Sequence, residues 1–191
     1  WSCIIPLPKT VPCDSSVGNY RPVSITSFPC RIFEKILVGH ILDFSIKNKL
    51  IPEEQHGFLK NRSRETAILY ALNDWTLAIE NGKQVDVVYF DFAKAFDRVS
   101  HKKLVTKLES MGFPGFICKW IKNWLSERKM FVKVGNSSSD VLECISGVPQ
   151  GSVLGPILFT LFTSDLAFSL REFGCRFIMY ADDIKIYRTI D

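Results

Sequence analysis

The chain contains 191 residues, of which 47% are hydrophobic and 23% are charged. A chain of this length and apolar content forms one large domain or two small units that share a core, and global disorder is excluded. The formal net charge of +4 is compatible with nucleic-acid binding but excludes a strongly basic, histone-like protein.

No apolar stretch is long enough to cross a membrane. The longest, residues 153–162, is interrupted by Gly155 and Pro156 and falls short of the roughly 20 residues that a span needs. We therefore expect no membrane partner and an intracellular location. The six cysteines lie far apart; their even number allows a disulfide framework, but the length and composition favour free thiols. The chain begins with Trp1 and ends at Asp191, which indicates a piece of a longer polypeptide.

The first half of the chain is expected to be mainly helical. Residues 1–30 are rich in proline and are predicted to form an extended, loop-like entry. Helical spacing of apolar residues predicts helices over 31–49 and 65–81, separated by an irregular polar segment. The second helix is expected to bury Ile68, Leu69, Leu72, Trp75, Leu77 and Ile79. Residues 85–92 form a mostly apolar run, which predicts a buried strand.

The second half adds two hairpins to further helices. Helices are predicted over 104–111, 116–125 and 156–170. Hairpins are predicted from 130–134 with 141–145, and from 175–180 with 184–187. This order of elements indicates an α+β fold, in which helices pack on an antiparallel sheet.

Three acidic residues carry the strongest chemical signal. Asp182 and Asp183 lie at the predicted tip of the last hairpin, where adjacent carboxylates repel each other unless a divalent cation neutralises them. Asp91 stands near the end of the predicted strand 85–92. If both segments pair in one sheet, the carboxylates converge into a two-metal phosphoryl-transfer site, with the main-chain carbonyl of Phe92 as a further ligand. The alternative for Asp91 is a cap on the following turn.

A glycine-rich loop precedes the predicted helix 156–170. Its glycines let the main chain approach a ligand closely, and Gln150 offers a donor and an acceptor to a base or sugar. The positive end of the helix that starts near Pro156 suits a phosphate. The alternative is an ordinary turn before a helix.

A second loop, residues 55–64, contains three cations, Lys60, Arg62 and Arg64. Such a loop can clamp a triphosphate or a template phosphate, although many basic loops are only solvated. His56 is expected to be a turn or packing residue.

These segments together resemble a known family. The resemblance rests on Asn19–Ile25, Gln55–Ser63, Asp91–Asp97, Gly147–Pro156, Leu161–Leu166 and Tyr180–Asp183. In this order they resemble the reverse transcriptase domain of non-LTR (LINE-type) retrotransposons. The resemblance covers essentially the whole chain, and the conjunction of motifs is highly specific. The chain departs from the family at Asn61, where Gly is usual, at Arg64, where Thr is usual, and at Ser164, where Asn is usual.

The resemblance implies a right-hand polymerase fold. Residues 1–84 would form fingers and 85–191 the palm, with a fingers-like insertion around 101–146 and no thumb in this chain. It implies RNA-templated DNA synthesis with two Mg²⁺ ions, for which Mn²⁺ can substitute. The implied partners are an RNA template, a DNA primer, a dNTP, and the thumb and endonuclease domains of a parent polyprotein. The family implies a nuclear location, with the cytoplasm as the alternative.

The resemblance also implies residue roles. Asp91, Asp182 and Asp183 would be the catalytic, metal-binding acids. The nucleotide-binding residues would be Arg62, Phe96, Gln150 and Gly151, with the Phe96 ring disfavouring a ribose 2′-hydroxyl. The nucleic-acid-binding residues would be Lys60, Arg64 and Tyr180. Two alternatives stay open: a truncated, inactive nucleic-acid-binding remnant of a retroelement, and a polymerase of an intron maturase or telomerase-like enzyme.

Overall fold

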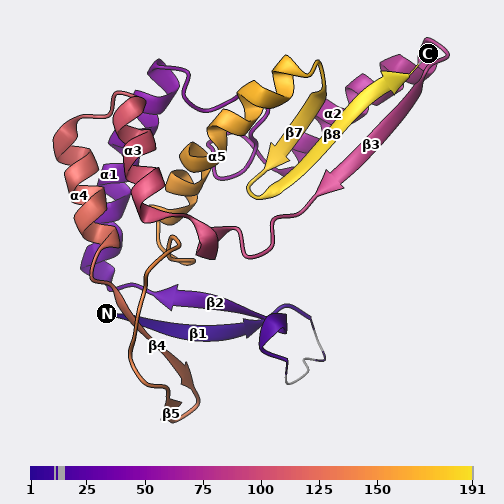
Figure 1. Ribbon diagram of the computed structural model, residues 1–191. Coiled ribbons are helices and arrows are strands. Elements are labelled where there is room, and N and C mark those ends of the chain that lie inside the picture. The colour runs from indigo at the N-terminus through magenta and orange to yellow at the C-terminus, as the bar shows by residue number, and fades with distance from the viewer. Residues whose placement is uncertain (11, 13–15, 191) are drawn as a thin grey trace. The chain divides into compact units, whose positions relative to one another are not determined.

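The computed structural model describes residues 1–10, 12 and 16–190 (Figure 1). The helices are α1 (Phe28–Lys47), α2 (Arg64–Glu80), α3 (His101–Ser110), α4 (Gly115–Leu125) and α5 (Gly155–Glu172), with short 3₁₀ turns η1 (Val17–Asn19) and η2 (Phe96–Arg98). The strands are β1 (Ser2–Pro8), β2 (Tyr20–Ile25), β3 (Gln84–Phe90), β4 (Lys129–Val134), β5 (Ser137–Ser138), β6 (Leu142–Glu143), β7 (Arg176–Tyr180) and β8 (Asp183–Ile190). The predicted α+β class is confirmed. Of the helices described, none is long and apolar enough to cross a membrane.

The chain forms two compact units that alternate along the sequence. The first contains residues 1–44 and 96–158, and the second contains residues 45–95 and 159–191. Because each unit is assembled from two separated stretches, a division at residue 84 into fingers and palm stays a prediction.

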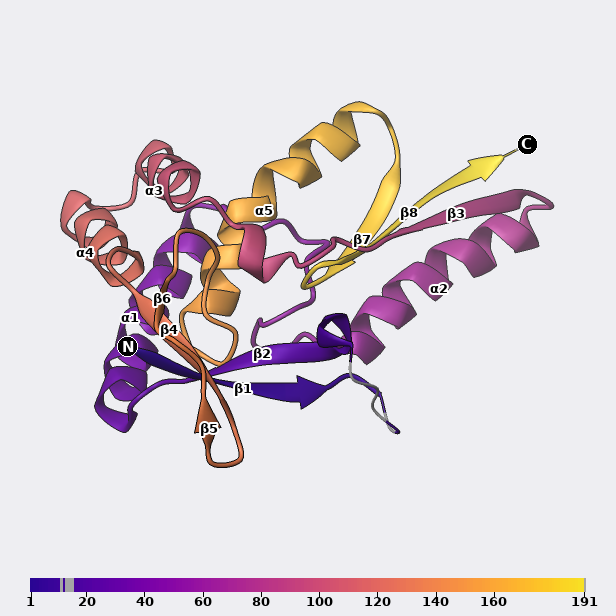
Figure 2. The same ribbon diagram turned by 60° about the horizontal axis from the view of Figure 1, so that its bottom comes forward.

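The first unit contains a mixed sheet of order β2-β1-β4-β5, with β6 paired to β4 (Figure 2). The prediction of a loop-like entry is wrong, because β1 and β2 form an antiparallel pair. Pro6 stands directly opposite Pro22 in this pair, so their missing N–H groups fit a position where no ladder hydrogen bond is made. The parallel pairing of β1 with β4 covers only residues 2–4, and no second partner needs the N–H of Pro6.

Helices complete the core of the first unit. Its fully buried apolar side chains include Ile41, Leu104, Leu108, Ile121 and Leu125. The predicted helices 104–111 and 116–125 are confirmed as α3 and α4.

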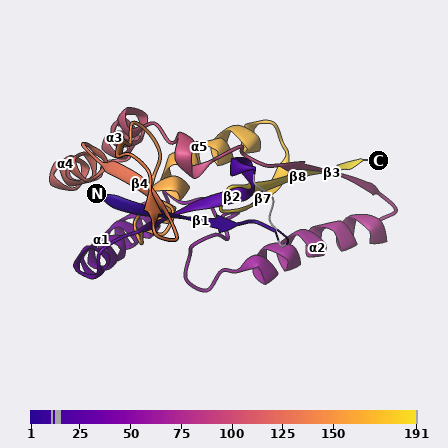
Figure 3. The same cartoon turned by 90° about the horizontal axis from the view of Figure 1, so that it is seen from below.

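The second unit is a three-stranded antiparallel sheet of order β3-β8-β7. Figure 3 shows α2 on one side of these strands and α5 on the other. Phe177, Met179 and Ile184 pack with Ala167 of α5, whereas Ile178 packs with α2. Alternate residues of β7 therefore face opposite helices, as the period of two in a strand requires.

The prediction of which side chains of α2 are buried is wrong. Helix α2 packs through its alanines Ala67, Ala71 and Ala78, because small side chains let a helix approach a sheet closely. The large side chains predicted to be buried project outward, with Leu69 65% exposed and Ile79 67% exposed; Trp75 alone is partly buried against the alanines.

Strand β3 is also more exposed than its apolar sequence predicts. Within the described part of the chain it pairs with β8 alone, so one edge is open, and Tyr89 is 66% exposed. The five cysteines that the structure describes are free thiols, as predicted.

Candidate active site

The three predicted catalytic acids all belong to the second unit. The register of β3 with β8 ends at the pair Phe90–Ile184, and that of β7 with β8 ends at the pair Tyr180–Asp183. Asp91 follows Phe90 and Asp183 precedes Ile184, so each lies one residue beyond the last pair of this register. The register thus brings Asp91 and Asp183 to one corner of the sheet, at the end where the β7–β8 turn lies (Figure 1).

The β7–β8 turn consists of two residues, Ala181 and Asp182. Ala181 is buried and has a φ of 59°, in the left-handed region that favours glycine. A non-glycine residue there costs about 1–3 kcal/mol and persists only where its surroundings hold it. The carboxamide of Gln55 lies within hydrogen-bonding distance of both main-chain polar groups of Ala181. The sequence placed Gln55 only within the loop 55–64, and it gave no sign that this side chain reaches the turn.

The donor chemistry of this corner fits a divalent cation. Asp91 and Asp183 are exposed and Asp182 is half-buried, and carboxylate and carbonyl oxygens are the ligands that Mg²⁺ prefers. Phe92, whose main-chain carbonyl is the further ligand predicted, follows Asp91 directly. In the described residues, however, no three His, Cys, Asp or Glu side chains stand close enough together to hold a metal ion. The backbone brings the acids to one corner, and their side chains are not gathered into a three-ligand cluster.

Arg62, the predicted triphosphate contact, is bound to its own loop. Its Nη1 donates to the main-chain carbonyl of Gln55 at 2.7 Å and to that of Glu53. The nucleotide role of Arg62 therefore stays a prediction. The backbone shows why asparagine can stand at position 61, where glycine is usual in the family. Asn61 has a φ of 62°, and asparagine tolerates this left-handed region better than most residues other than glycine.

Two of the predicted nucleic-acid contacts lie together. The guanidinium of Arg64 sits over the ring of Tyr180, 5.4 Å from its centroid, in a cation–π arrangement. Lys60 is exposed on the same loop. Since Tyr180 is the last residue of β7, this contact places a cation beside the strand that leads to the acids.

The predicted nucleotide contacts Phe96, Gln150 and Gly151 belong to the first unit, where hydrogen bonds bring two motifs together. The N–H of Val148 donates to the carbonyl of Phe96 at 2.9 Å, and Gln150 Nε2 donates to Asp97 Oδ1 at 3.1 Å. The sequence separated these motifs by about fifty residues, so their adjacency is a result of the fold.

Position 151 requires a glycine. Its φ is 102°, and a Cβ there would lie 2.6 Å from the carbonyl oxygen of Ser24. The N–H of Ser24 in turn donates to the carbonyl of Gln150 at 2.7 Å. The loop is thus fixed against β2 by its own main chain.

The start of α5 does not offer the predicted phosphate site. The fully buried carboxylate of Glu34 accepts hydrogen bonds from the N–H groups of Val153 at 2.7 Å and Leu154 at 3.2 Å. Ser152 Oγ accepts from the N–H of Gly155 at 3.0 Å. The phosphate prediction is wrong for these N–H groups, because side chains of the protein already satisfy them.

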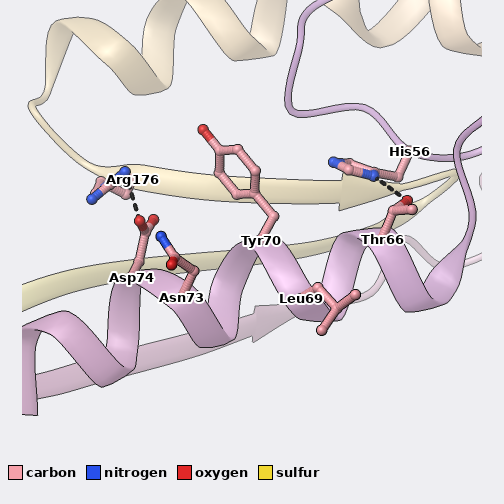
Figure 4. A pocket seen from close by; sticks show the side chains of 7 residues that line it. All are labelled: His56, Thr66, Leu69, Tyr70, Asn73, Asp74 and Arg176. Carbon is pink, nitrogen blue, oxygen red and sulfur yellow. Dashed lines mark hydrogen bonds and ion pairs between the residues drawn. The ribbon is translucent and has the colours of Figure 1, made fainter.

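A pocket of about 530 Å³ lies between α2 and β7 (Figure 4). It is lined by His56, Thr66, Leu69, Tyr70, Asn73, Asp74 and Arg176. His56 Nδ1 lies 2.8 Å from Thr66 Oγ1, and burial, with a smaller effect of Arg62, lowers the pKa of His56. Asp74 forms an ion pair with Arg176 at 2.8 Å and accepts a hydrogen bond from Tyr187. Burial, together with the bond to Asp74, raises the pKa of Tyr187.

These contacts attach α2 to the sheet. His56, buried and bonded to the first turn of α2, therefore has the packing role that the sequence predicted.

Comparison with known proteins identifies the relatives of this chain. The profile of the family described as "Reverse transcriptase (RNA-dependent DNA polymerase)" matches residues 7–190. The chain is 31% identical over 178 residues to the "Probable RNA-directed DNA polymerase from transposon BS" of Drosophila melanogaster, with 91% of this chain and 20% of that protein covered. It is also 31% identical over 188 residues to the "RNA-directed DNA polymerase from mobile element jockey" of the same species, with 96% of this chain and 20% of that protein covered. The chain thus spans about a fifth of the length of these relatives.

Solved structures share the fold. The apo telomerase of Candida tropicalis, truncated from its C-terminal domain, matches with a TM-score of 0.64 at 12% identity, covering 88% of this chain and 41% of that chain. The same enzyme in complex with a fragment of telomeric RNA matches with a TM-score of 0.66 at 12% identity, covering 90% and 34%. At this identity the likeness establishes a polymerase-like fold and nothing about substrates.

Proposed function

This chain belongs to the reverse transcriptase (RNA-dependent DNA polymerase) family, and we propose from that premise that its three aspartates catalyse RNA-directed DNA synthesis. Its curated relatives are polymerases of non-LTR retrotransposons. The observation that carries the proposal is the strand register, whose last pair, Phe90–Ile184, stands one residue before Asp91 and one residue after Asp183, beside the turn that holds Asp182. Separate segments of the sequence thereby contribute acids to one corner.

Reverse transcriptases generally use divalent metal ions, and this corner is the proposed place for them. The ligands would be the carboxylates of Asp91, Asp182 and Asp183 and the main-chain carbonyl of Phe92. Two bound Mg²⁺ ions would activate the attacking hydroxyl and neutralise the charge of the triphosphate. The part of this chain is to bring anionic oxygens to the ends of hydrogen-bonded strands, where they can neutralise the charge of the ions.

The proposed reaction joins a dNTP to a primer on an RNA template. The primer 3′-hydroxyl oxygen attacks the α-phosphate, a new phosphodiester bond forms, and the bond to the leaving pyrophosphate breaks. The family places Phe96, Gln150, Gly151 and Arg62 around the incoming nucleotide.

The nucleic-acid contacts are proposed at the basic loop. The family places Lys60, Arg64 and Tyr180 along the nucleic acid, and the contact between Arg64 and Tyr180 supports joint use of these two. Contacts of this kind bind the phosphate backbone and do not read sequence.

Primer extension by the 191-residue chain tests the proposal. A DNA primer annealed to an RNA template is incubated with dNTPs and Mg²⁺, and Asp91→Asn and Asp182→Asn are compared with the wild type. Both variants should abolish extension, because each loses an anionic ligand. Asp86→Asn is the matched control, since Asp86 is exposed on the same strand β3 and away from the corner.

Near-normal extension by Asp91→Asn or Asp182→Asn would contradict the assignment. Binding of the primer–template by the wild type without extension would support the second reading, a nucleic-acid-binding remnant of a retroelement.

A further inference from the structure

We propose that Gln55 is a positioning residue that fixes the β7–β8 turn and, through it, the carboxylate of Asp182. This inference rests on the proposed function, because it gives Asp182 a catalytic role. It concerns a side chain that lies outside the acidic corner and acts on it through the main chain of Ala181.

The carboxamide of Gln55 binds three main-chain groups. Its Oε1 accepts hydrogen bonds from the N–H of Ala181 at 3.0 Å and from the N–H of Gly57 at 2.7 Å. Its Nε2 donates to the carbonyl of Ala181 at 3.4 Å, the longest of the three. The side chain is 1% exposed, so water does not compete for these groups. A carboxamide is suited to this position because it carries a donor and an acceptor on one planar group.

Gln55 is itself held in place by its backbone. The N–H of Met179 donates to the carbonyl of Glu54 at 2.9 Å, and the N–H of His56 donates to the carbonyl of Met179 at 2.8 Å. These bonds form a parallel bridge between Gln55 and Met179. Arg62 Nη1 binds the carbonyl of Gln55 from the loop side. The carboxamide therefore reaches the turn from a fixed base.

The turn needs such support because its backbone is strained. Ala181 has a φ of 59°, and any relaxation toward a common conformation would rotate the peptide group that joins it to Asp182. The main chain of Gly57 packs against the same turn, because a Cβ there would lie 2.3 Å from the nitrogen of Ala181 and 3.0 Å from Oε1 of Gln55. Gly57 permits the close approach, and the carboxamide of Gln55 keeps the strained peptide in one orientation.

The first measurement is residue-resolved amide hydrogen exchange, which does not depend on activity. In the wild type the N–H of Ala181 should be protected. In Gln55→Leu, which removes donor and acceptor at similar size, it should exchange at least about tenfold faster, while the amide of Ile178 changes little. Gln55→Glu keeps an oxygen acceptor for this N–H but sets a second oxygen against the carbonyl of Ala181, so it should retain part of the protection. Gln84→Ala, an exposed glutamine at the start of β3, is the control.

The second measurement is the steady-state rate of primer extension against dNTP concentration. A loosened turn misplaces an acid without removing a nucleotide contact, so Gln55→Leu should lower kcat by about 10- to 100-fold with KM within about threefold of the wild type. Gln55→Glu should recover part of kcat. If Gln55 only stabilised the fold, kcat would not recover in Gln55→Glu.

The outcomes separate the two proposals. Unchanged Ala181 exchange in Gln55→Leu, or equal loss of protection in Gln55→Glu, would overturn the role of Gln55. Wild-type kcat in Gln55→Leu with an unprotected Ala181 amide would also overturn it. If Gln55→Leu loses protection throughout the sheet, the exchange rate of the Ala181 amide in Gln55→Glu decides whether the carboxamide fixes the turn. Absence of extension by the wild type itself, with the exchange pattern as expected, would count against the proposed function and leave the attachment of the turn to Gln55 in place.

Discussion

Replacement of Gly57 by alanine tests the close packing beneath the acidic turn. A Cβ on residue 57 would lie 2.3 Å from the nitrogen of Ala181 and 2.9 Å from its Cα, whereas ordinary contact begins at 3.4 Å. The neighbour is backbone, so the turn or the Gly57 segment must move by about 1 Å. Overpacking of this kind costs about 1–3 kcal/mol of unfolding free energy. A displacement of about 1 Å at a catalytic group costs about 100-fold in rate.

Urea denaturation and primer extension measure these two effects. Gly39→Ala is the matched control: Gly39 lies within α1, and a Cβ there meets nothing within 4 Å. That variant should gain about 0.5–1 kcal/mol, because glycine is unfavourable inside a helix. If Gly57→Ala were as stable and as active as the wild type, the packing described for the turn would be wrong.

Three further predictions concern other parts of the chain. Phe96→Val should raise the ratio of ribonucleotide to deoxyribonucleotide incorporation, if the ring excludes the 2′-hydroxyl as in the family; an unchanged ratio would count against that role. Glu34→Ala should lower the unfolding free energy by about 2–4 kcal/mol, because the N–H groups at the start of α5 lose their acceptor; a loss within the error of urea denaturation would contradict this. Burial lowers the pKa of His56 from its ordinary 6.5, so below that pH the unfolded state binds more protons than the folded state. The contribution of neutral His56 to the unfolding free energy should therefore be complete above about pH 6.5 and decrease as the pH falls below it. His56→Gln should flatten that decline in denaturation curves recorded across this pH range, and an unaltered slope would exclude His56 as its source.

Periodicity predicted most of the helices and both late strands. The predicted helices 116–125 and 156–170 agree closely with α4 and α5, and the last hairpin agrees with β7 and β8. These segments have strong apolar patterns bounded by glycine or proline, which is where local sequence is most informative.

Burial and long-range contacts could not be predicted in the same way. The pattern on α2 identified its large apolar residues as buried, but the helix packs through alanines, which a hydrophobicity pattern ranks lower. The strands β1 and β2 were not predicted because proline argues against a strand. The sequence alone does not show that Pro6 and Pro22 stand opposite each other, where a strand pair tolerates them.

In the candidate site, too, local features could be predicted from the sequence and long-range contacts could not. The acids and their separate segments were evident from the sequence, and the strand register supports their meeting at one corner. The contact of Gln55 with Ala181, which are 126 residues apart, could not be predicted, because nothing in the local sequence encodes which main-chain group a buried carboxamide reaches.

The most direct test of the central claim is Mn²⁺ binding by the 191-residue chain, followed by electron paramagnetic resonance with Mg²⁺ as competitor. If Asp91 and Asp183 share one corner, the wild type should bind Mn²⁺, and either Asp91→Asn or Asp183→Asn should weaken binding at least about tenfold through loss of an anionic ligand. Equal binding by the wild type and both variants would contradict the shared site.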